Sequence, residues 1–355
     1  MRTKLLNQGF AKNCFILSFK YCSEDINILL KNSDSLNQVK LSYKMDTGIY
    51  TIITSIQKFG KVVVESKPCE LSFVRGKDRQ AQLMVAEQST PMSVENIQLK
   101  LKQKINIKGS SIRGCSFLSD GRMAFSCDKT DTVTFINKEG AELFQIGKDK
   151  IGSSSYDKAY IKDNNSVAVS CGRGSNRCIA IIDIESKKVM AIIPMDTNIY
   201  GMAVRGRAIY YCSSAKELKM LNLSDKSVSD IISSDKSNFL YVATSGDKLY
   251  YTVRNTDTVT CCNLHGTPQW EFTDGGVLCS SYGISVDNDG NVYVVCCRSS
   301  NVVVISTDGR RHRQLLSSED GLKNPRAIDY DKSTNRLLVV NESQYAFLFD
   351  VTKGE

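Results

Sequence analysis

Residues 281–309 read SYGISVDNDGNVYVVCCRSSNVVVISTDG, three apolar segments separated by the turn DNDGN (287–291) and the polar loop RSSN (298–301). Each apolar segment is short and rich in Val, Ile, Tyr and Cys, and Asp-Gly is a frequent hairpin turn. This composition predicts three antiparallel strands joined by tight connections. The same order of segments recurs from residue 111 onward, with a weaker fourth segment in most copies.

The second segment of each copy sets the repeat length. Its six occurrences start 44, 41, 41, 43 and 45 residues apart, and they read GRMAFSC (121–127), NSVAVSC (165–171), GRAIYYC (206–212), DKLYYTV (247–253), GNVYVVC (290–296) and NRLLVVN (335–341). No segment with helical periodicity lies between the copies, which disfavours a βαβ fold or a helical solenoid. The repeat therefore predicts an all-β domain, a six-bladed β-propeller.

The sixth copy has no fourth segment after YAFLFDV (345–351), so its sheet would expose an unpaired edge. The alternating segment IQLKLKQKINI (97–107) precedes the first copy and has no other obvious partner. We expect residues 97–107 to supply the missing outer strand and to close the ring.

The chain before the propeller divides into three parts. Residues 26–66 form a small α/β segment, in which Ile49, Ile52, Ile56 and Phe59 have helical spacing and VVV (62–64) is a strand. Residues 67–96 are a linker, residues 97–355 are the propeller, and residues 1–25 stay unassigned, with disorder as one alternative. The apolar stretch CFILSF (14–19) is too short for a membrane span and no cleavage site follows it.

Charge is unevenly distributed along the chain. Residues 1–110 contain 17 Lys and Arg against 9 Asp and Glu, whereas residues 111–355 contain 29 of each. The basic surplus therefore lies outside the repeats, which disfavours nucleic acid as the ligand of the propeller.

Residues 281–309 and 321–351 (GLKNPRAIDYDKSTNRLLVVNESQYAFLFDV) resemble NHL-type propellers at the end of tripartite-motif (TRIM) proteins. Residues 26–66 are similar to the segment that follows the coiled coil in those proteins. The resemblance implies a substrate- or partner-recognition module of a ubiquitin-ligase-type protein, with oligomerisation through the N-terminal segment as an option. No C-x-x-C occurs in the chain, so the RING and B-box zinc modules are absent and we expect no ligase activity.

The 13 cysteines predict packing residues rather than chemistry. An odd number of cysteines without a signal peptide favours free thiols and a cytoplasmic location. Cys127, Cys171, Cys212 and Cys296 share one repeat position, as core residues do. Cys297, next to Arg298, is the one thiol for which a neighbouring cation predicts a lowered pKa.

No catalytic residue, metal or cofactor is expected. His265 and His312 lie between the third and fourth strands of their blades, far from the axis where a metal-dependent hydrolase or lyase would need them. DNDGN (287–291) lacks the helices and the closing Glu of a calcium loop, and CGRGSNRC (171–178) lacks the helix of a phosphate-binding loop.

The loops after the second and fourth strands of a propeller share one face, and ten polar or aromatic residues are predicted there. This predicted upper rim consists of Arg113, Tyr156, Arg173, Arg177, Tyr200, Arg254, Tyr282, Arg298, Asn324 and Arg326. Tyr and Arg are typical anchors of protein interfaces, and they also stack on single-stranded RNA. We expect a non-catalytic protein-interaction module that does not contact a membrane. RNA binding is the alternative function, and a metal-dependent hydrolase or lyase is the remote alternative. The simplest interpretation is a solvated rim that binds no ligand.

Overall fold

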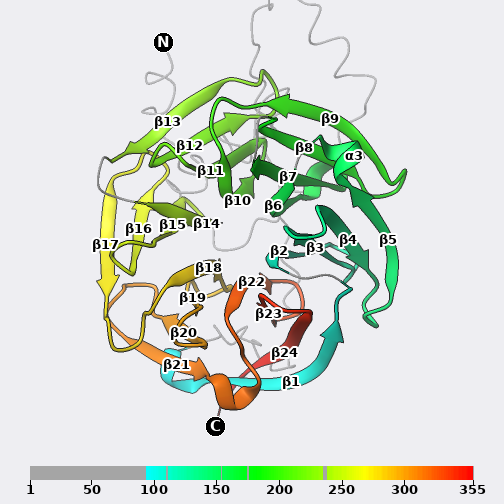
Figure 1. Ribbon diagram of the computed structural model, residues 1–355. Helices are drawn as coiled ribbons and strands as arrows, with labels where there is room; N and C mark the ends of the chain where they lie inside the picture. The colour runs from blue at the N-terminus through cyan, green and yellow to red at the C-terminus, as the bar shows by residue number, and fades with distance from the viewer. Residues whose placement is uncertain (1–92, 109–110, 153, 174–175, 235–237, 355) are drawn as a thin grey trace, which may run out of the picture. The chain divides into compact units, whose positions relative to one another are not determined.

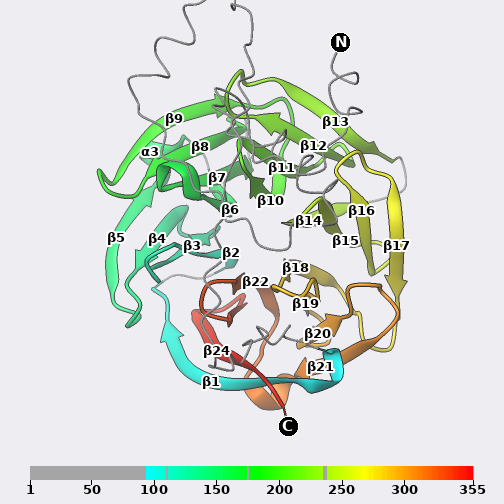
Figure 2. The same cartoon turned by 180° about the vertical axis from the view of Figure 1, so that it is seen from behind.

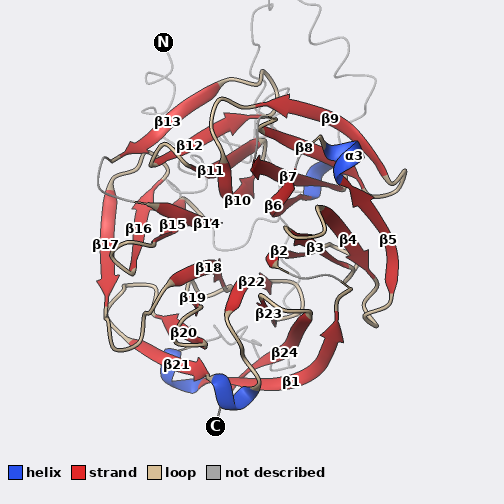
Figure 3. Ribbon diagram, viewed as in Figure 1, coloured by secondary structure: helices blue, strands red, loops and turns tan. Residues whose placement is uncertain are grey.

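The repeats fold as six four-stranded antiparallel sheets arranged around a common centre (Figures 1 and 3). The computed structural model describes residues 93–354 except 109–110, 153, 174–175 and 235–237. The prediction of a six-bladed β-propeller is confirmed. The predictions for residues 1–92 lie outside the described residues.

Each of the first five blades runs from an innermost first strand to an outermost fourth strand. Blade 1 contains β2 (Ile112–Phe117), β3 (Met123–Cys127), β4 (Thr132–Ile136) and β5 (Glu142–Gly147); blade 2 contains β6 (Ser154–Ile161), β7 (Ser166–Arg173), β8 (Cys178–Asp183) and β9 (Lys188–Pro194). Blade 3 contains β10 (Ile199–Arg205), β11 (Ala208–Ser213), β12 (Glu217–Asn222) and β13 (Val228–Ser233). Blade 4 contains β14 (Phe239–Ser245), β15 (Lys248–Val253), β16 (Thr258–Asn263) and β17 (Pro268–Thr273); blade 5 contains β18 (Ser281–Val286), β19 (Val292–Cys296), β20 (Asn301–Ile305) and β21 (His312–Leu316).

Blade 6 is assembled from both ends of the domain. It contains β22 (Pro325–Asp331), β23 (Arg336–Asn341) and β24 (Tyr345–Lys353), and β1 (Ile97–Asn106) is its outer strand. The pairing is antiparallel from Ile97 opposite Lys353 to Asn106 opposite Tyr345. Both views place β1, in cyan, beside β24, in red (Figures 1 and 2). The predicted closing strand is confirmed.

Helical turns are short and lie in the connections. They are η1 (Val94–Asn96), α3 (Lys148–Ile151), η2 (Lys162–Asn164) and η3 (Ser318–Asp320). Within the described part of the chain, no helix is long and apolar enough to cross a membrane.

The core lies between the blades, because the inner strands of each sheet are covered on both faces. All five residues of β3, β19 and β20 are buried, whereas the outermost strand β13 is largely exposed. Cys127, Cys171, Cys212 and Cys296 have no exposed surface, in agreement with their predicted packing role. The adjacent Cys261 and Cys262 pack in different clusters, as opposite faces of a strand require.

Side-chain hydroxyls on second strands connect neighbouring blades. Ser126, Ser170 and Thr252 occupy one repeat position and donate to the carbonyls of Tyr156, Tyr200 and Tyr282 at 2.7, 3.0 and 2.9 Å. Each bond joins a second strand to the first strand of the next blade. These bonds position the first strands, which carry the candidate site.

Candidate functional site

The first strands carry six large polar side chains near the face formed by the loops after second and fourth strands. Five of them share one repeat position, and the sixth, Tyr241, is one residue further along its strand. We call these residues the tyrosine–arginine cluster: Arg113, Tyr156, Tyr200, Tyr241, Tyr282 and Arg326. Five of them belong to the predicted upper rim. Tyr241 was missed; it follows Leu240, which has the repeat position that Tyr200 and Tyr282 have in their blades.

The tyrosines of the cluster contact one another around the centre of the ring. Ring centroids lie 5.3 Å apart for Tyr156 and Tyr200, 6.1 Å for Tyr156 and Tyr241, and 6.3 Å for Tyr241 and Tyr282. All three contacts are tilted, a favourable geometry for aromatic pairs. Burial raises the pKa of Tyr156 to about 12 and also raises the pKa of Tyr241, so both hydroxyls are neutral at physiological pH.

The arginines complete the cluster and are held by carboxylates. The Arg326 guanidinium lies 4.1 Å from the Tyr282 ring centroid, and that of Arg113 lies 5.9 Å from the Tyr156 ring. Glu342 contacts both cations, Arg113 at 3.5 Å and Arg326 at 3.2 Å. The positive charge at the centre of this face is therefore partly neutralised within the protein.

Tyr241 spans the centre of the ring. Neighbouring first strands lie side by side in chain order and β2 also lies beside β22, so β14 of blade 4 is opposite β2 of blade 1. The Tyr241 hydroxyl donates to the Arg113 carbonyl at 2.6 Å. The cluster consequently presents a packed centre on this face.

The other predicted rim residues lie farther out, and the structure does not bring them into the cluster. Arg177, Arg254, Arg298 and Asn324 are exposed, and Arg173 lies at the end of β7. Arg254 reaches inward over the Tyr282 ring at 5.9 Å, whereas Arg177 donates to the Asp196 carbonyl at 2.7 Å. The upper rim thus consists of a buried centre surrounded by exposed cations.

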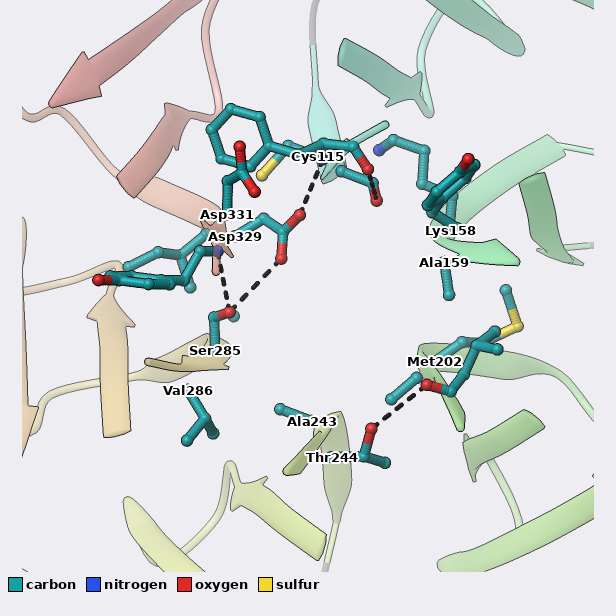
Figure 4. Close-up of a pocket in the computed structure, with 18 of the residues that line it drawn as sticks. Cys115, Lys158, Ala159, Met202, Ala243, Thr244, Ser285, Val286, Asp329 and Asp331 are labelled. Atoms are coloured by element: carbon teal, nitrogen blue, oxygen red, sulfur yellow. Dashed lines mark hydrogen bonds between the residues drawn. The ribbon is translucent and has the colours of Figure 1, made fainter. Parts of the chain in front are cut away.

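A cavity of about 400 Å³ lies on the other side of the cluster, toward the turns that join first and second strands. Figure 4 shows the side chains of Ala159, Ala243 and Val286 around its open centre, with those of Ser285 and Asp329 turned toward each other. This cavity was not predicted, because the sequence argument concerned only the opposite face.

Two buried carboxylates in the cavity wall bind backbone N–H groups of the next blade. Asp157 accepts from the Met202 N–H at 2.8 Å, and Asp329 accepts from the Phe117 N–H at 2.8 Å and the Ser285 hydroxyl at 3.4 Å. Burial raises the pKa of Asp157 to about 7 and that of Asp329 to about 6. Their contacts indicate a structural role in joining first strands.

Lys158 is the exception at its repeat position. The equivalent residues of the other first strands are all apolar: Cys115, Met202, Val242, Ile284 and Ile328. Lys158 is 3% exposed, and its Nζ has no hydrogen-bond partner among the described residues. Burial lowers its pKa to about 8, while Cys115 and Asp157 oppose that shift.

Other predicted chemistry-bearing residues lie away from this centre. His265 is in the turn before β17, and His312 begins β21, where its Nε2 lies 3.6 Å from Asp274. Cys297 is only 8% exposed; burial raises its pKa and Arg326 opposes this in part, so the expected lowering is wrong. Among the residues with described positions, no three His, Cys, Asp or Glu side chains form a metal-binding group.

Comparisons with known proteins show a similar fold and no closer relationship. No protein-family model matches the chain, and no curated protein does. A Bacteroides thetaiotaomicron protein of unknown function is 13% identical over 72% of each chain, with a TM-score of 0.58. Virginiamycin B lyase from Staphylococcus aureus is 12% identical, with 72% of this chain and all of that chain covered and a TM-score of 0.55.

A third similar structure is the Cps50 (Swd1) β-propeller domain of Myceliophteria thermophila. It is 9% identical, the match covers 72% of this chain and 100% of that chain, and the TM-score is 0.53. At such low identities, likeness extends to the fold alone. The comparisons therefore show a β-propeller and leave its ligand to be argued from its own residues.

Proposed function

We propose that this propeller is a non-catalytic protein-recognition module that binds its partner through the upper rim, as the recognition end of a TRIM-like protein. The propeller fold fits a protein-interaction module. The observation that supports this site is the tyrosine–arginine cluster, a rigid aromatic centre surrounded by the exposed side chains of Arg177, Arg254 and Arg298. Aromatic and Arg anchors around a packed centre are typical of protein interfaces.

RNA is the second candidate ligand, because Tyr and Arg can stack on bases. The charge on this face favours a protein. Glu342 neutralises Arg113 and Arg326 at the centre, and Asp128 lies 3.3 Å from Arg113. An RNA site would gain from uncompensated cations there.

A lyase activity has less support from the residues. One similar structure, 15% identical over 71% of this chain and 88% of that chain with a TM-score of 0.52, is a catalytically inactive histidine-to-alanine variant of virginiamycin B lyase with quinupristin. Both histidines of this chain lie on the outer part of their blades, at the third-to-fourth strand connection. Neither imidazole is among the residues lining the cavity.

Site-specific photocrosslinking tests the proposed face. A photoreactive residue would replace Arg298 on the upper rim or, as a matched control, exposed Arg310 in the β20–β21 turn on the opposite face. We expect protein adducts from position 298 in cells but not from position 310. Arg254→Ala should lower the yield of the position-298 adducts roughly tenfold. Adducts that nuclease removes would favour RNA; equal protein adducts from both positions would contradict the upper rim as the binding face.

A further inference from the structure

Cys171 and Cys178 are cross-strand neighbours at the end of blade 2. They are directly paired residues of the antiparallel strands β7 and β8, and theirs is the last pair of that ladder. Paired Cα atoms in such a ladder lie about 4.5–5.5 Å apart, inside the range of about 4.4–6.8 Å that disulfides use. A directly paired position of this kind therefore meets the Cα separation that a disulfide requires.

The two thiols also interact with each other. Their proximity raises the pKa of Cys171 and lowers the pKa of Cys178. Each thiol also donates to a backbone carbonyl, Cys171 to that of Val169 at 3.6 Å and Cys178 to that of Ile151 at 3.5 Å. Cys171 has no exposed surface, whereas Cys178 is 4% exposed. Cys178 is therefore the more accessible thiol of the pair, and Cys171 lies directly opposite it on the neighbouring strand.

The two described pairs of cysteines that are adjacent in the sequence do not face each other across a strand ladder. Cys261 and Cys262 point to opposite faces of β16 and pack in different clusters. Cys296 ends β19 and pairs with Asn301 on the neighbouring strand, and Cys297 follows it in the loop. Adjacent cysteines in the sequence are thus internal controls for a pair that the fold brings together.

We propose that Cys171 and Cys178 form an oxidative modification site, a dithiol that a small hydroperoxide converts to a disulfide. The Cys178 thiolate attacks a peroxide oxygen and releases hydroxide, which leaves a sulfenic acid on Cys178. The Cys171 sulfur then attacks the Cys178 sulfur, and the sulfenic hydroxyl leaves with a proton as water. Two thiols and one hydrogen peroxide give one disulfide and two waters.

The disulfide would close the connection that contains Arg173 and Arg177 of the upper rim. Its ring would contain the eight residues 171–178. By chain entropy, a loop of this size raises the melting temperature of a domain this large by about 5 °C. We expect this increase on oxidation, and its loss on reduction.

Mass spectrometry of the full chain identifies the bond. Trypsin cleaves after Arg173 and Arg177, so the disulfide would join DNNSVAVSCGR (163–173) to CIAIIDIESK (178–187). The purified, folded chain would be treated with hydrogen peroxide, its remaining thiols alkylated in denaturant, and the digest analysed with and without reductant. We expect this linked pair to form first, and before any peptide containing Cys261 or Cys262 is modified.

Single substitutions test the order of the reaction. In Cys171→Ser, the sulfenic acid on Cys178 should persist and be trapped by dimedone; in Cys178→Ser, Cys171 should label roughly tenfold more slowly. The wild-type digest shows whether the Cys171–Cys178 disulfide forms, even if a variant fails to fold. Absence of the linked pair from folded, oxidised protein, or its formation no faster than random pairs in denaturant, would overturn the proposal.

Discussion

The Tyr241 hydroxyl of blade 4 and the Arg113 carbonyl of blade 1 meet across the centre of the propeller at 2.6 Å. The two strands are three blades apart, so this hydrogen bond joins opposite sides of the ring. Neighbouring blades are joined by hydroxyl–carbonyl bonds such as that from Ser126 to Tyr156. Tyr241 adds a connection that no pair of neighbouring blades can provide.

Tyr241→Phe removes this connection while it preserves the ring contacts with Tyr156 and Tyr282. The Arg113 carbonyl loses its side-chain donor in a partly buried setting, so we expect the free energy of unfolding to fall by about 1–2 kcal/mol. Urea denaturation at pH 7 measures this change in the free energy of unfolding. A midpoint equal to that of the wild type would show that the bond across the centre does not contribute to stability.

Lys158→Met should stabilise the domain, because the equivalent residue of blade 3 is Met202 and the buried Lys158 ammonium has no hydrogen-bond partner in the described part of the chain. The folded pKa of Lys158 is lowered to about 8 from 10.5. Below pH 8 the native state carries the buried charge, and between pH 8 and 10.5 only the unfolded state is protonated, so wild-type stability rises there. We expect an advantage of about 1–3 kcal/mol for the variant below pH 8, shrinking toward pH 10 in urea titrations.

Exposed Lys129→Met is the matched control for the pH dependence of Lys158→Met. It removes the same charge from a second-to-third strand loop rather than from the cavity wall. Its stability difference from wild type should not shrink between pH 8 and 10. An advantage of Lys158→Met that is constant with pH would mean that packing, and not the buried charge, sets its effect.

Asp157→Asn should change how the free energy of unfolding depends on pH between pH 4 and 7. Burial raises the folded pKa of Asp157 to about 7, above the unfolded value near 3.8. Between pH 4 and 7 the native state holds a proton that the unfolded state has lost, so this group lowers stability as pH rises. Asn keeps an acceptor for the Met202 N–H and removes the titration. We expect the variant to gain stability relative to wild type from pH 4 to 7, and exposed Asp163→Asn to show no such trend.

Two positions on β1 test whether the closing strand carries stability for the whole ring. Ile105 is 2% exposed and packs with Met123 and Leu348, whereas Leu101 on the same strand is 52% exposed. Ile105→Ala should lower the free energy of unfolding by roughly 2–4 kcal/mol, and Leu101→Ala by less than about 1 kcal/mol. Thermal unfolding should stay a single transition; a separate early transition would mean that blade 6 unfolds on its own.

The ring could be predicted because its information is local and repeated. Six second strands of similar composition, each after a turn, specify a blade each. The unpaired edge of the last blade requires a partner, and residues 97–107 form an alternating segment suited to supply it. Packing of the shared cysteine position followed from the same register. These features depend on strand periodicity, which a sequence displays directly.

The centre of the ring could be predicted only in part. Arg113 and Tyr282 were expected on the upper face, but alternation within a strand does not reveal that side chains from opposite blades meet. Aligning the first strands as closely as the second strands would have shown that Lys158 alone departs from an apolar position. It would not have identified Tyr241, because Leu240 has the shared position in blade 4. The burial of Asp157 depends on packing between neighbouring blades, and the pairing of Cys171 with Cys178 depends on the register of β7 and β8.

The shared construction of blade 6 has a consequence for synthesis on the ribosome. β1 is made first and its partner β24 last, with about 240 residues between them. At roughly 5–20 residues per second, β1 waits on the order of 10–50 s before its hydrogen-bonding partner exists. During that interval Ile97 and Ile105 have no blade to cover them, so the nascent chain exposes a β-strand edge that chaperones would recognise. Folding of this domain is therefore completed only after nearly all of it has been translated.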